Sequence, residues 1–380
     1  MIKLYGKVVH VSGIKVKAGP IALTTNPNLP KPLAGKFALI SEDPNVSKDY
    51  YTVFRKKVVS HSVNSEYLLP EELHYLGDGD FISIDPASQF TRVLYRAQSK
   101  QNSILLTEQC NHYCLMCSQP PKRVNDRWLL EETRQLIKML PSSTPELGFT
   151  GGEPTLYGQD FIDLMALIKN YLPNTSIHIL TNGRSFNDIE FARAYARIGH
   201  QDMMLGIPIY SDDPVRHDYV VQARGAFDET VRGILNLKSL NQKVEIRIVL
   251  HKQTIDRLPN LCEFIARNLL FVDHVALMGL EMIGFTRANM DKLWVDPYDY
   301  RDTLSAATLL LNSYGINVSI YNHPRCLIND DVVFANRKSI SDWKNEYVPE
   351  CKGCLKMSEC GGFFTSGMLY KYSDHITPYK

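Results

Sequence analysis

The sequence predicts an α/β protein whose largest part is an open, partial (β/α)6 barrel of the TIM type. Six short apolar runs alternate with amphipathic segments at intervals of roughly 30 to 40 residues. Short β-branched runs come before this alternation, and a cysteine-rich tail follows it. We therefore expect a small β-rich domain over 1–98, the barrel over 99–315 and a cysteine-rich extension over 316–380.

The N-terminal segment has the pattern of short strands joined by turns. Its apolar runs KVVHVSGIKV, KFALI and DFISID are separated by NPNLPKP, SEDPN and LGDGD. Val and Ile favour strands, whereas Pro, Gly, Asn and Asp favour turns.

The barrel strands are expected at 103–108, 146–150, 176–181, 203–210, 244–250 and 274–280. Helices are expected at 128–140, 160–172, 187–199, 226–240, 258–270 and 300–315, where apolar residues recur at i, i+3, i+4 and i+7. Right-handed crossovers would make these strands parallel. Chemistry in such barrels lies at the C-terminal ends of the strands.

Composition excludes several classes of function. The 380 residues include 42 basic and 41 acidic side chains, for a net charge of +1. No global field therefore favours nucleic acid or anionic lipid. The N-terminus lacks a signal-peptide pattern, and no apolar run approaches the ~18 residues of a membrane span. We expect a cytoplasmic protein without nucleic-acid or membrane partners.

The loop after the first barrel strand, TEQCNHYCLMCSQPP, carries Cys110, Cys114 and Cys117. Thiolate is the ligand type of iron-sulfur clusters. Three thiolates on a [4Fe-4S] cluster leave one iron open to chelate a ligand. The alternatives are a zinc site, with His112 as a fourth ligand, or three buried thiols.

A second cysteine group lies in the tail. Cys351, Cys354 and Cys360 have x2 and x5 spacing, and Cys326 precedes them by 25 residues. Four thiolates would close the shell of an auxiliary [4Fe-4S] cluster or of a structural zinc. Cys262, within an amphipathic segment, is expected to be a buried small hydrophobe.

The spacing CxxxCxMC after a first barrel strand resembles the cluster motif of the radical S-adenosylmethionine (SAM) superfamily. The resemblance implies that the open iron binds the methionine moiety of SAM. One-electron cleavage then gives methionine and a 5′-deoxyadenosyl radical that abstracts hydrogen from a substrate. It also implies that Met116 packs near adenine, although a plain core residue is the alternative.

Three further strand ends match the superfamily. FTGGEP resembles its GGE motif, which implies that Gly151, Gly152 and Glu153 hold the methionine amino group. Thr181, Asn182 and Gly183 then face the ribose, or form a plain turn. Ser211 resembles a polar residue near the ribose hydroxyls, or caps a turn. Arg247, a charge among apolar neighbours, would pair with the methionine carboxylate or with a structural carboxylate such as Glu281.

The tail resembles SPASM and twitch extensions, which hold auxiliary clusters, although no further cysteine follows Cys360. CLMCSQPP, YNHPRCLI, DWKNEY and CGGFFTS resemble the His-Xaa-Ser system radical maturases over roughly residues 95–366. This family implies a ribosomally synthesised precursor peptide with His-Xaa-Ser repeats, a second radical SAM maturase and an external electron donor.

Other interpretations stay open. A radical SAM enzyme acting on a small molecule in cofactor biosynthesis would share the barrel and the clusters, and a non-enzymatic zinc-binding protein would share the cysteines. The N-terminal domain either binds a leader peptide by strand addition or packs against the barrel. No catalytic acid or base is assigned among His217, Asp218, Glu281 and Tyr210, which lie near strand ends.

Overall fold

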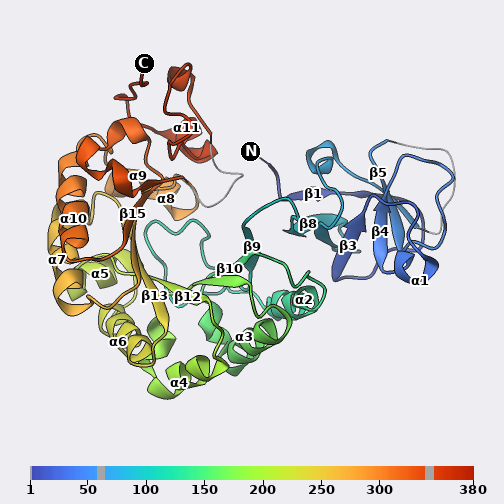
Figure 1. The fold of residues 1–380 in the computed structure, drawn as a ribbon, viewed down its shortest axis with the longest axis horizontal. Coiled ribbons are helices and arrows are strands. Elements are labelled where there is room, and N and C mark those ends of the chain that lie inside the picture. Colours follow the sequence, from blue (N-terminus) through green and yellow to red (C-terminus); the bar gives the residue numbers. More distant parts are fainter. Residues whose placement is uncertain (1, 58–64, 339–345) are drawn as a thin grey trace.

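The computed structural model describes residues 2–57, 65–338 and 346–380. Residues 342–345 of the DWKNEY segment lie outside these ranges. Figure 1 shows a smaller N-terminal β-rich body beside a larger body in which helices surround a curved sheet.

The N-terminal body is built on a mixed eight-stranded sheet of order β1-β8-β7-β3-β4-β5-β6-β2. The sheet ends, β1 and β2, are separated only by Val8 and pair with β8 and β6, so the sheet curls back on itself. Among the described residues, β1 and β2 each pair with one neighbouring strand. The elements are β1 (Tyr5–Lys7), β2 (Val9–Gly13), β3 (Pro20–Thr24), α1 (Lys31–Ala34), β4 (Phe37–Ile40), β5 (Thr52–Arg55), β6 (Ser65–Leu68), β7 (Phe81–Ile84) and β8 (Phe90–Tyr95).

This body packs against the first barrel helix, α2 (Arg127–Ile137). Glu132 of α2 accepts a 2.7 Å hydrogen bond from Arg92 and a further one from the Ser83 hydroxyl. The Arg92 guanidinium also lies 4.6 Å from the centre of the Trp128 ring. The N-terminal domain therefore packs against the barrel through α2.

The larger body contains an eight-stranded parallel sheet whose strands follow sequence order. This topology confirms the predicted α/β fold with parallel barrel strands. Two strands beyond the six expected ones continue the sheet past residue 315. The strands are β9 (Asn102–Leu105), β10 (Glu146–Thr150), β11 (Ser176–Leu180), β12 (Met203–Pro208), β13 (Lys243–Leu250), β14 (His274–Gly279), β15 (Val318–Tyr321) and β16 (Asn336–Arg337).

Helices cover the outer face of this sheet (Figure 1). Strand residues that face them, such as Phe149, Ile179 and Ile246, are fully buried. The helices are α3 (Gln159–Tyr171), α4 (Ile189–Ile198), α5 (Pro214–Val221), α6 (Ala226–Ser239), α7 (Leu258–Asn268) and α10 (Arg301–Ser313), and the short ones are α8 (Phe285–Ala288), α9 (Met290–Leu293) and α11 (Thr365–Tyr370). Within the described ranges, no helix has the length and apolar character to cross a bilayer.

Helix α5 was not expected from the sequence. Its charged run Arg216, His217 and Asp218 hides the apolar periodicity. Asp213 caps it by accepting the Val215 N–H, and Pro214 occupies its first turn.

The imidazole of His251, which directly follows β13, is a polar group that the fold buries. Its side chain is fully buried, and neither ring nitrogen has a partner among the described residues. The ring lies 6.2 Å from that of Tyr210. Burial lowers the pKa of His251 to about 3.

This burial makes stability depend on pH in a predictable direction. Because the pKa of His251 is lower in the folded state, stability is lost as pH falls from about 6.5 towards about 3. We expect His251→Leu to remove about 2 kcal/mol of the loss between pH 7 and pH 5. Urea midpoints measured on iron-free protein check this, with exposed His375→Leu as control. An unchanged pH slope in His251→Leu would contradict it.

Candidate cofactor site

The cysteine loop joins β9 to α2, and Asp126 holds its start. The Asp126 carboxylate is almost fully buried and accepts hydrogen bonds from Thr107 Oγ1 at 3.0 Å, from Gln109 Nε2 at 3.1 Å and from the Glu108 N–H. Burial alone would raise the pKa of Asp126, but these bonds outweigh it and lower the pKa. The carboxylate thus stays charged and fixes the first residues of the loop.

The middle of the loop is held between α5 and α8. Leu115 N–H donates to Val220 O at 2.9 Å, and Phe285 N–H donates to Cys117 O at 2.9 Å. Gly284, with φ of +57°, lies so close that a Cβ there would be 2.3 Å from Cys117 O. Only glycine fits this approach without displacing the backbone that carries the third cysteine.

The three loop thiols are partly buried, and burial raises the pKa of each. Burial first, and then charge on neighbouring groups that include Glu153 and Cys117, raises the pKa of Cys110 to about 12. Burial also raises the pKa of Cys114, and Cys117 and Cys110 add to this effect. A bound metal supplies the positive charge that such thiols need to ionise.

This donor set suits an iron-sulfur cluster, because thiolate is the ligand type that such clusters use. Among the described residues, no group of three or more His, Cys, Asp or Glu side chains is placed to hold a metal ion. His112 is buried beside the thiols, its Nε2 has no hydrogen-bond partner in the described chain, and burial lowers its pKa to about 3.

The end of β10 lies directly against this loop. Gly152 N–H donates to Thr107 O at 2.8 Å, and Glu153 N–H donates to Gln109 O at 2.8 Å. A Cβ on Gly152 would be 2.0 Å from Gln109 O and 3.0 Å from Cys110 Cβ. The two glycines of the predicted motif therefore allow the second strand end to touch the cysteine loop.

The Glu153 carboxylate is completely buried beside the first cysteine. Its Oε1 accepts three hydrogen bonds, from Thr155 N–H at 2.9 Å, Thr155 Oγ1 at 2.6 Å and Thr181 Oγ1 at 2.7 Å. In the part of the chain that the structure describes, its Oε2 accepts only one, from Asn182 N–H at 2.6 Å. Burial raises the pKa of Glu153, and no Lys, Arg or His pairs with it in the described part of the chain. The free capacity of Oε2 fits a cationic ammonium group.

The third and fourth strand ends serve partly structural roles. Asn182 Nδ2 donates to Asn111 Oδ1 at 2.6 Å, which ties the end of β11 to the cysteine loop. Gly183 has φ of +79°, as a turn would. Ser211 is fully buried and accepts a 3.1 Å hydrogen bond from Asp213 N–H, which forms the turn expected if Ser211 is structural. Met116 is buried in an apolar cluster. The predicted SAM contacts of these residues stay predictions.

Arg247 has a carboxylate partner that sequence reasoning missed. Its Nη1 donates to Glu245 Oε1 at 2.7 Å, so the structural carboxylate is Glu245 and not Glu281. Glu245 also accepts from His274 Nδ1 at 2.7 Å. Polar residues at alternate positions of otherwise apolar strands are the signal that could have revealed this inner-face network.

The candidate acids and bases near strand ends are largely occupied within the fold. His217 is buried, and its Nδ1 accepts from Tyr210 N–H at 3.2 Å. Asp218 accepts from Phe227 N–H at 2.9 Å and from Gly225 N–H. Sequence proximity to a strand end therefore did not identify a catalytic acid or base.

The second cysteine group is also brought together by the fold. Burial, and then the charges of Cys360 and Cys354, raise the pKa of Cys326, and Cys351 is affected by all three others. Cys360 Sγ accepts from Arg325 N–H at 3.2 Å and Gly362 N–H at 3.4 Å. Backbone N–H groups aimed at sulfur suit thiolate ligands. Cys262 is buried in α7, as expected.

Comparison with known proteins agrees with this geometry. The Fe-coproporphyrin III synthase of Methanosarcina barkeri (strain Fusaro / DSM 804) is 28% identical over 165 residues, which are 42% of this chain and 39% of that protein. The chain therefore spans about two fifths of this relative's length.

Two solved structures share the fold. SuiB of Streptococcus suis bound to S-adenosylmethionine matches with a TM-score of 0.50 and 15% identity, over 66% of this chain and 55% of that one. Native anSMEcpe with bound AdoMet matches with a TM-score of 0.52 and 15% identity, over 73% of this chain and 92% of that one. Its complex with AdoMet and the Cp18Cys peptide has a TM-score of 0.50, with 16% identity and the same coverage.

A family model described as the radical SAM superfamily matches residues 104–265. This range begins in β9 and ends in α7, and it contains the cysteine loop, the GGE motif, Asn182, Ser211 and Arg247. Enzymes of this superfamily use a [4Fe-4S] cluster and S-adenosylmethionine. The chain therefore contains a radical SAM superfamily domain.

Proposed function

We propose that this chain is a radical SAM enzyme that matures a ribosomally synthesised precursor peptide. The assignment of the cofactors rests on one observation: the ends of β10 and β11 both contact the loop that carries the first three cysteines. Gly151 and Gly152 bring the buried Glu153 against the residues that precede Cys110.

In this proposal Cys110, Cys114 and Cys117 hold the reactive [4Fe-4S] cluster. The bound cluster and SAM would supply a 5′-deoxyadenosyl radical that abstracts hydrogen from the substrate. Glu153 Oε2 binds the methionine ammonium, while Thr155, Thr181 and Asn182 hold its carboxylate in place. Met116, Asn182 and Ser211 are the further proposed SAM contacts. Arg247, which was expected among them, pairs with Glu245 and lines a cavity on the inner face of the sheet.

Cys326, Cys351, Cys354 and Cys360 hold an auxiliary [4Fe-4S] cluster in this proposal, in a SPASM-like or twitch-like extension. Burial and the neighbouring thiols raise the pKa values of Cys326 and Cys351, and backbone N–H groups donate to Cys360 Sγ. These observations support a closed site. Zinc is the competing metal for the same ligands.

The substrate is proposed to be a precursor peptide of the His-Xaa-Ser repeat type. The fold likeness to anSMEcpe, which has been solved with a bound peptide, supports a peptide substrate. A second radical SAM maturase and an external electron donor would complete the system.

Metal content tests the cluster assignment. We expect about eight irons and about eight sulfides per chain after anaerobic reconstitution, because two [4Fe-4S] clusters are proposed. Replacing Cys110, Cys114 and Cys117 by alanine should leave about four irons and abolish 5′-deoxyadenosine formation. Alanine at Cys262 is the matched control. Continued 5′-deoxyadenosine formation by the triple variant would refute the assignment.

Glu153→Gln tests the cationic ligand. Because glutamine keeps the shape and removes the charge, SAM affinity should fall by about tenfold or more while iron content is retained. Equilibrium dialysis with SAM measures the first quantity and iron counting the second. Unchanged SAM affinity in an iron-replete variant would be inconsistent with this role.

Action on a small molecule in cofactor biosynthesis is the second candidate. The 28% identity to Fe-coproporphyrin III synthase favours this candidate over a non-enzymatic zinc-binding protein. Such an enzyme would consume a metabolite without any peptide. The peptide proposal instead expects formation of 5′-deoxyadenosine to rise when the precursor peptide is added.

A further inference from the structure

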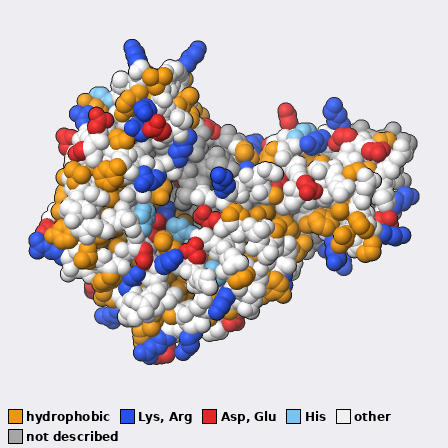
Figure 2. All heavy atoms as spheres, in the orientation of Figure 1, with side chains coloured by type: hydrophobic (Ala, Val, Ile, Leu, Met, Phe, Trp, Pro, Cys, Tyr) orange, Lys and Arg blue, Asp and Glu red, His pale blue; other side chains and the backbone are white. Residues whose placement is uncertain are grey.

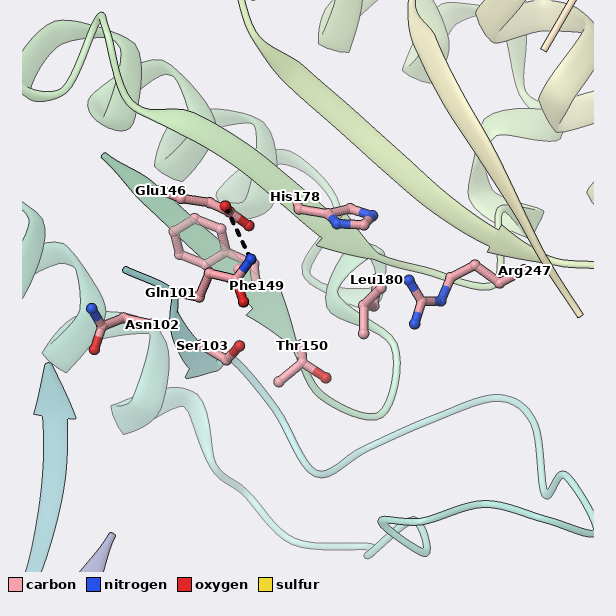
Figure 3. A pocket seen from close by; sticks show the side chains of 10 residues that line it. Gln101, Asn102, Ser103, Glu146, Phe149, Thr150, His178, Leu180 and Arg247 are labelled. Carbon is pink, nitrogen blue, oxygen red and sulfur yellow. Dashed lines mark hydrogen bonds between the residues drawn. The ribbon is translucent and has the colours of Figure 1, made fainter. Parts of the chain in front are cut away.

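The inner face of the parallel sheet contains a polar cavity that the cofactor assignment does not use. It lies among β9, β10, β11 and β13, and Figure 3 shows side chains from these strands pointing into it. Figure 2 shows histidine and charged side chains gathered around the hollow of the larger body. Thr150 and Leu180, at the cavity wall, directly precede Gly151 and Thr181 of the proposed SAM site.

Two glycines keep this cavity open. A Cβ on Gly148 would be 2.9 Å from Ser103 Oγ, and a Cβ on Gly206 would be 2.9 Å from both Arg247 Cδ and His178 Nε2. The interior of a purely structural barrel is filled by branched apolar side chains. On this inner face, the side chains of Arg247 and His178 instead lie next to Gly206, in space that a larger residue would fill.

The wall formed by Arg247 and His178 offers hydrogen-bond donors. Glu245 already accepts from Arg247 and from His274, and its Oε1 lies 3.4 Å from His178 Nε2. Within the described ranges, Arg247 Nη2 donates only to the Met278 sulfur, at 3.1 Å, and thioether sulfur is a weak acceptor. His178 Nε2 is buried without a well-formed hydrogen bond among the described residues.

We propose that Arg247 and His178 form a subsite for a carboxylate of the peptide substrate. A carboxylate oxygen would replace the Met278 sulfur on Nη2, and His178 would donate a second hydrogen bond. The carboxylate comes from an acidic side chain or from the chain terminus. This inference rests on the proposed peptide substrate and deepens it.

The opposite wall of the cavity carries acceptor oxygens, which disfavour a second carboxylate. Glu146 lies there with Gln101, whose Nε2 approaches Glu146 Oε2 at 3.5 Å, while its own Oε1 is buried without a partner among the described residues. These oxygens repel a second anion and accept an N–H. An acidic residue of the peptide would suit both walls if its carboxylate faced Arg247 and His178 and its backbone N–H faced Glu146.

Blocked amino acids test this subsite on the iron-reconstituted full chain. The probes are N-acetylglutamate α-amide, its neutral isostere N-acetylglutamine amide, and N-acetylglycine for a terminal carboxylate. We expect at least one carboxylate probe to bind and the neutral isostere to bind at least about tenfold more weakly. The tighter of the two carboxylate probes identifies the source of the carboxylate.

Three variants locate the binding. Arg247→Met should weaken the carboxylate probe by about tenfold or more, whereas Arg267→Met, at an exposed ion pair with Glu263 on α7, should not. Gly148→Ala should also weaken it, because the added methyl group enters the cavity without removing a charge. Circular dichroism checks that each variant is folded.

The proposal is overturned if neither carboxylate probe binds the native chain at about 10 mM, or if the neutral isostere binds equally well. It is also overturned if Arg247→Met weakens SAM binding and leaves probe binding unchanged. Probe binding requires no SAM cleavage. Absence of iron or of 5′-deoxyadenosine would therefore count against the proposed function alone.

Discussion

The buried carboxylate of Glu153 is the constraint on which the candidate site depends. Taking an isolated carboxylate out of water is costly unless hydrogen bonds and a positive charge compensate it. The fold supplies four hydrogen bonds from residues after β10 and β11. It supplies no cation among the described residues. The same carboxylate therefore connects the ends of β10 and β11 through hydrogen bonds. Its negative charge could be balanced by a positively charged ligand.

The segment from Gly284 to Trp294 links this site to the cysteine-rich extension. Its first residues pack on Cys117 through Phe285 N–H and the close approach of Gly284. Its far end, with Trp294, lines a second cavity at the C-terminal ends of β13 and β14. Phe363, close in sequence to Cys360, also lines that cavity. The segment therefore contacts the first cysteine loop and shares a cavity with a residue near the second cysteine group.

Most of the barrel was predictable because its strands and helices have strong periodicity. Strand β10 matches its predicted bounds, and the six predicted strands all occur in order. Helix α5 was missed because Arg216, His217 and Asp218 interrupt its apolar face. In the site, cysteine spacing indicated the loop. The alternation of Glu245 and Arg247 on one strand could have indicated their pairing. The contact of Glu245 with His274 of the next strand was not predictable, because contacts across strands need the register, which sequence alone does not specify.

The curled N-terminal sheet has a consequence for synthesis on the ribosome. Its first segment, residues 5–13, pairs with β6 and β8, which are made much later. Strand β1 therefore stays unpaired until β8 has left the exit tunnel, whereas β2 can pair once β6 has emerged. Nonlocal pairing of this kind closes slowly. Strand β9 begins at Asn102, so the barrel starts to emerge just as the first domain becomes able to close.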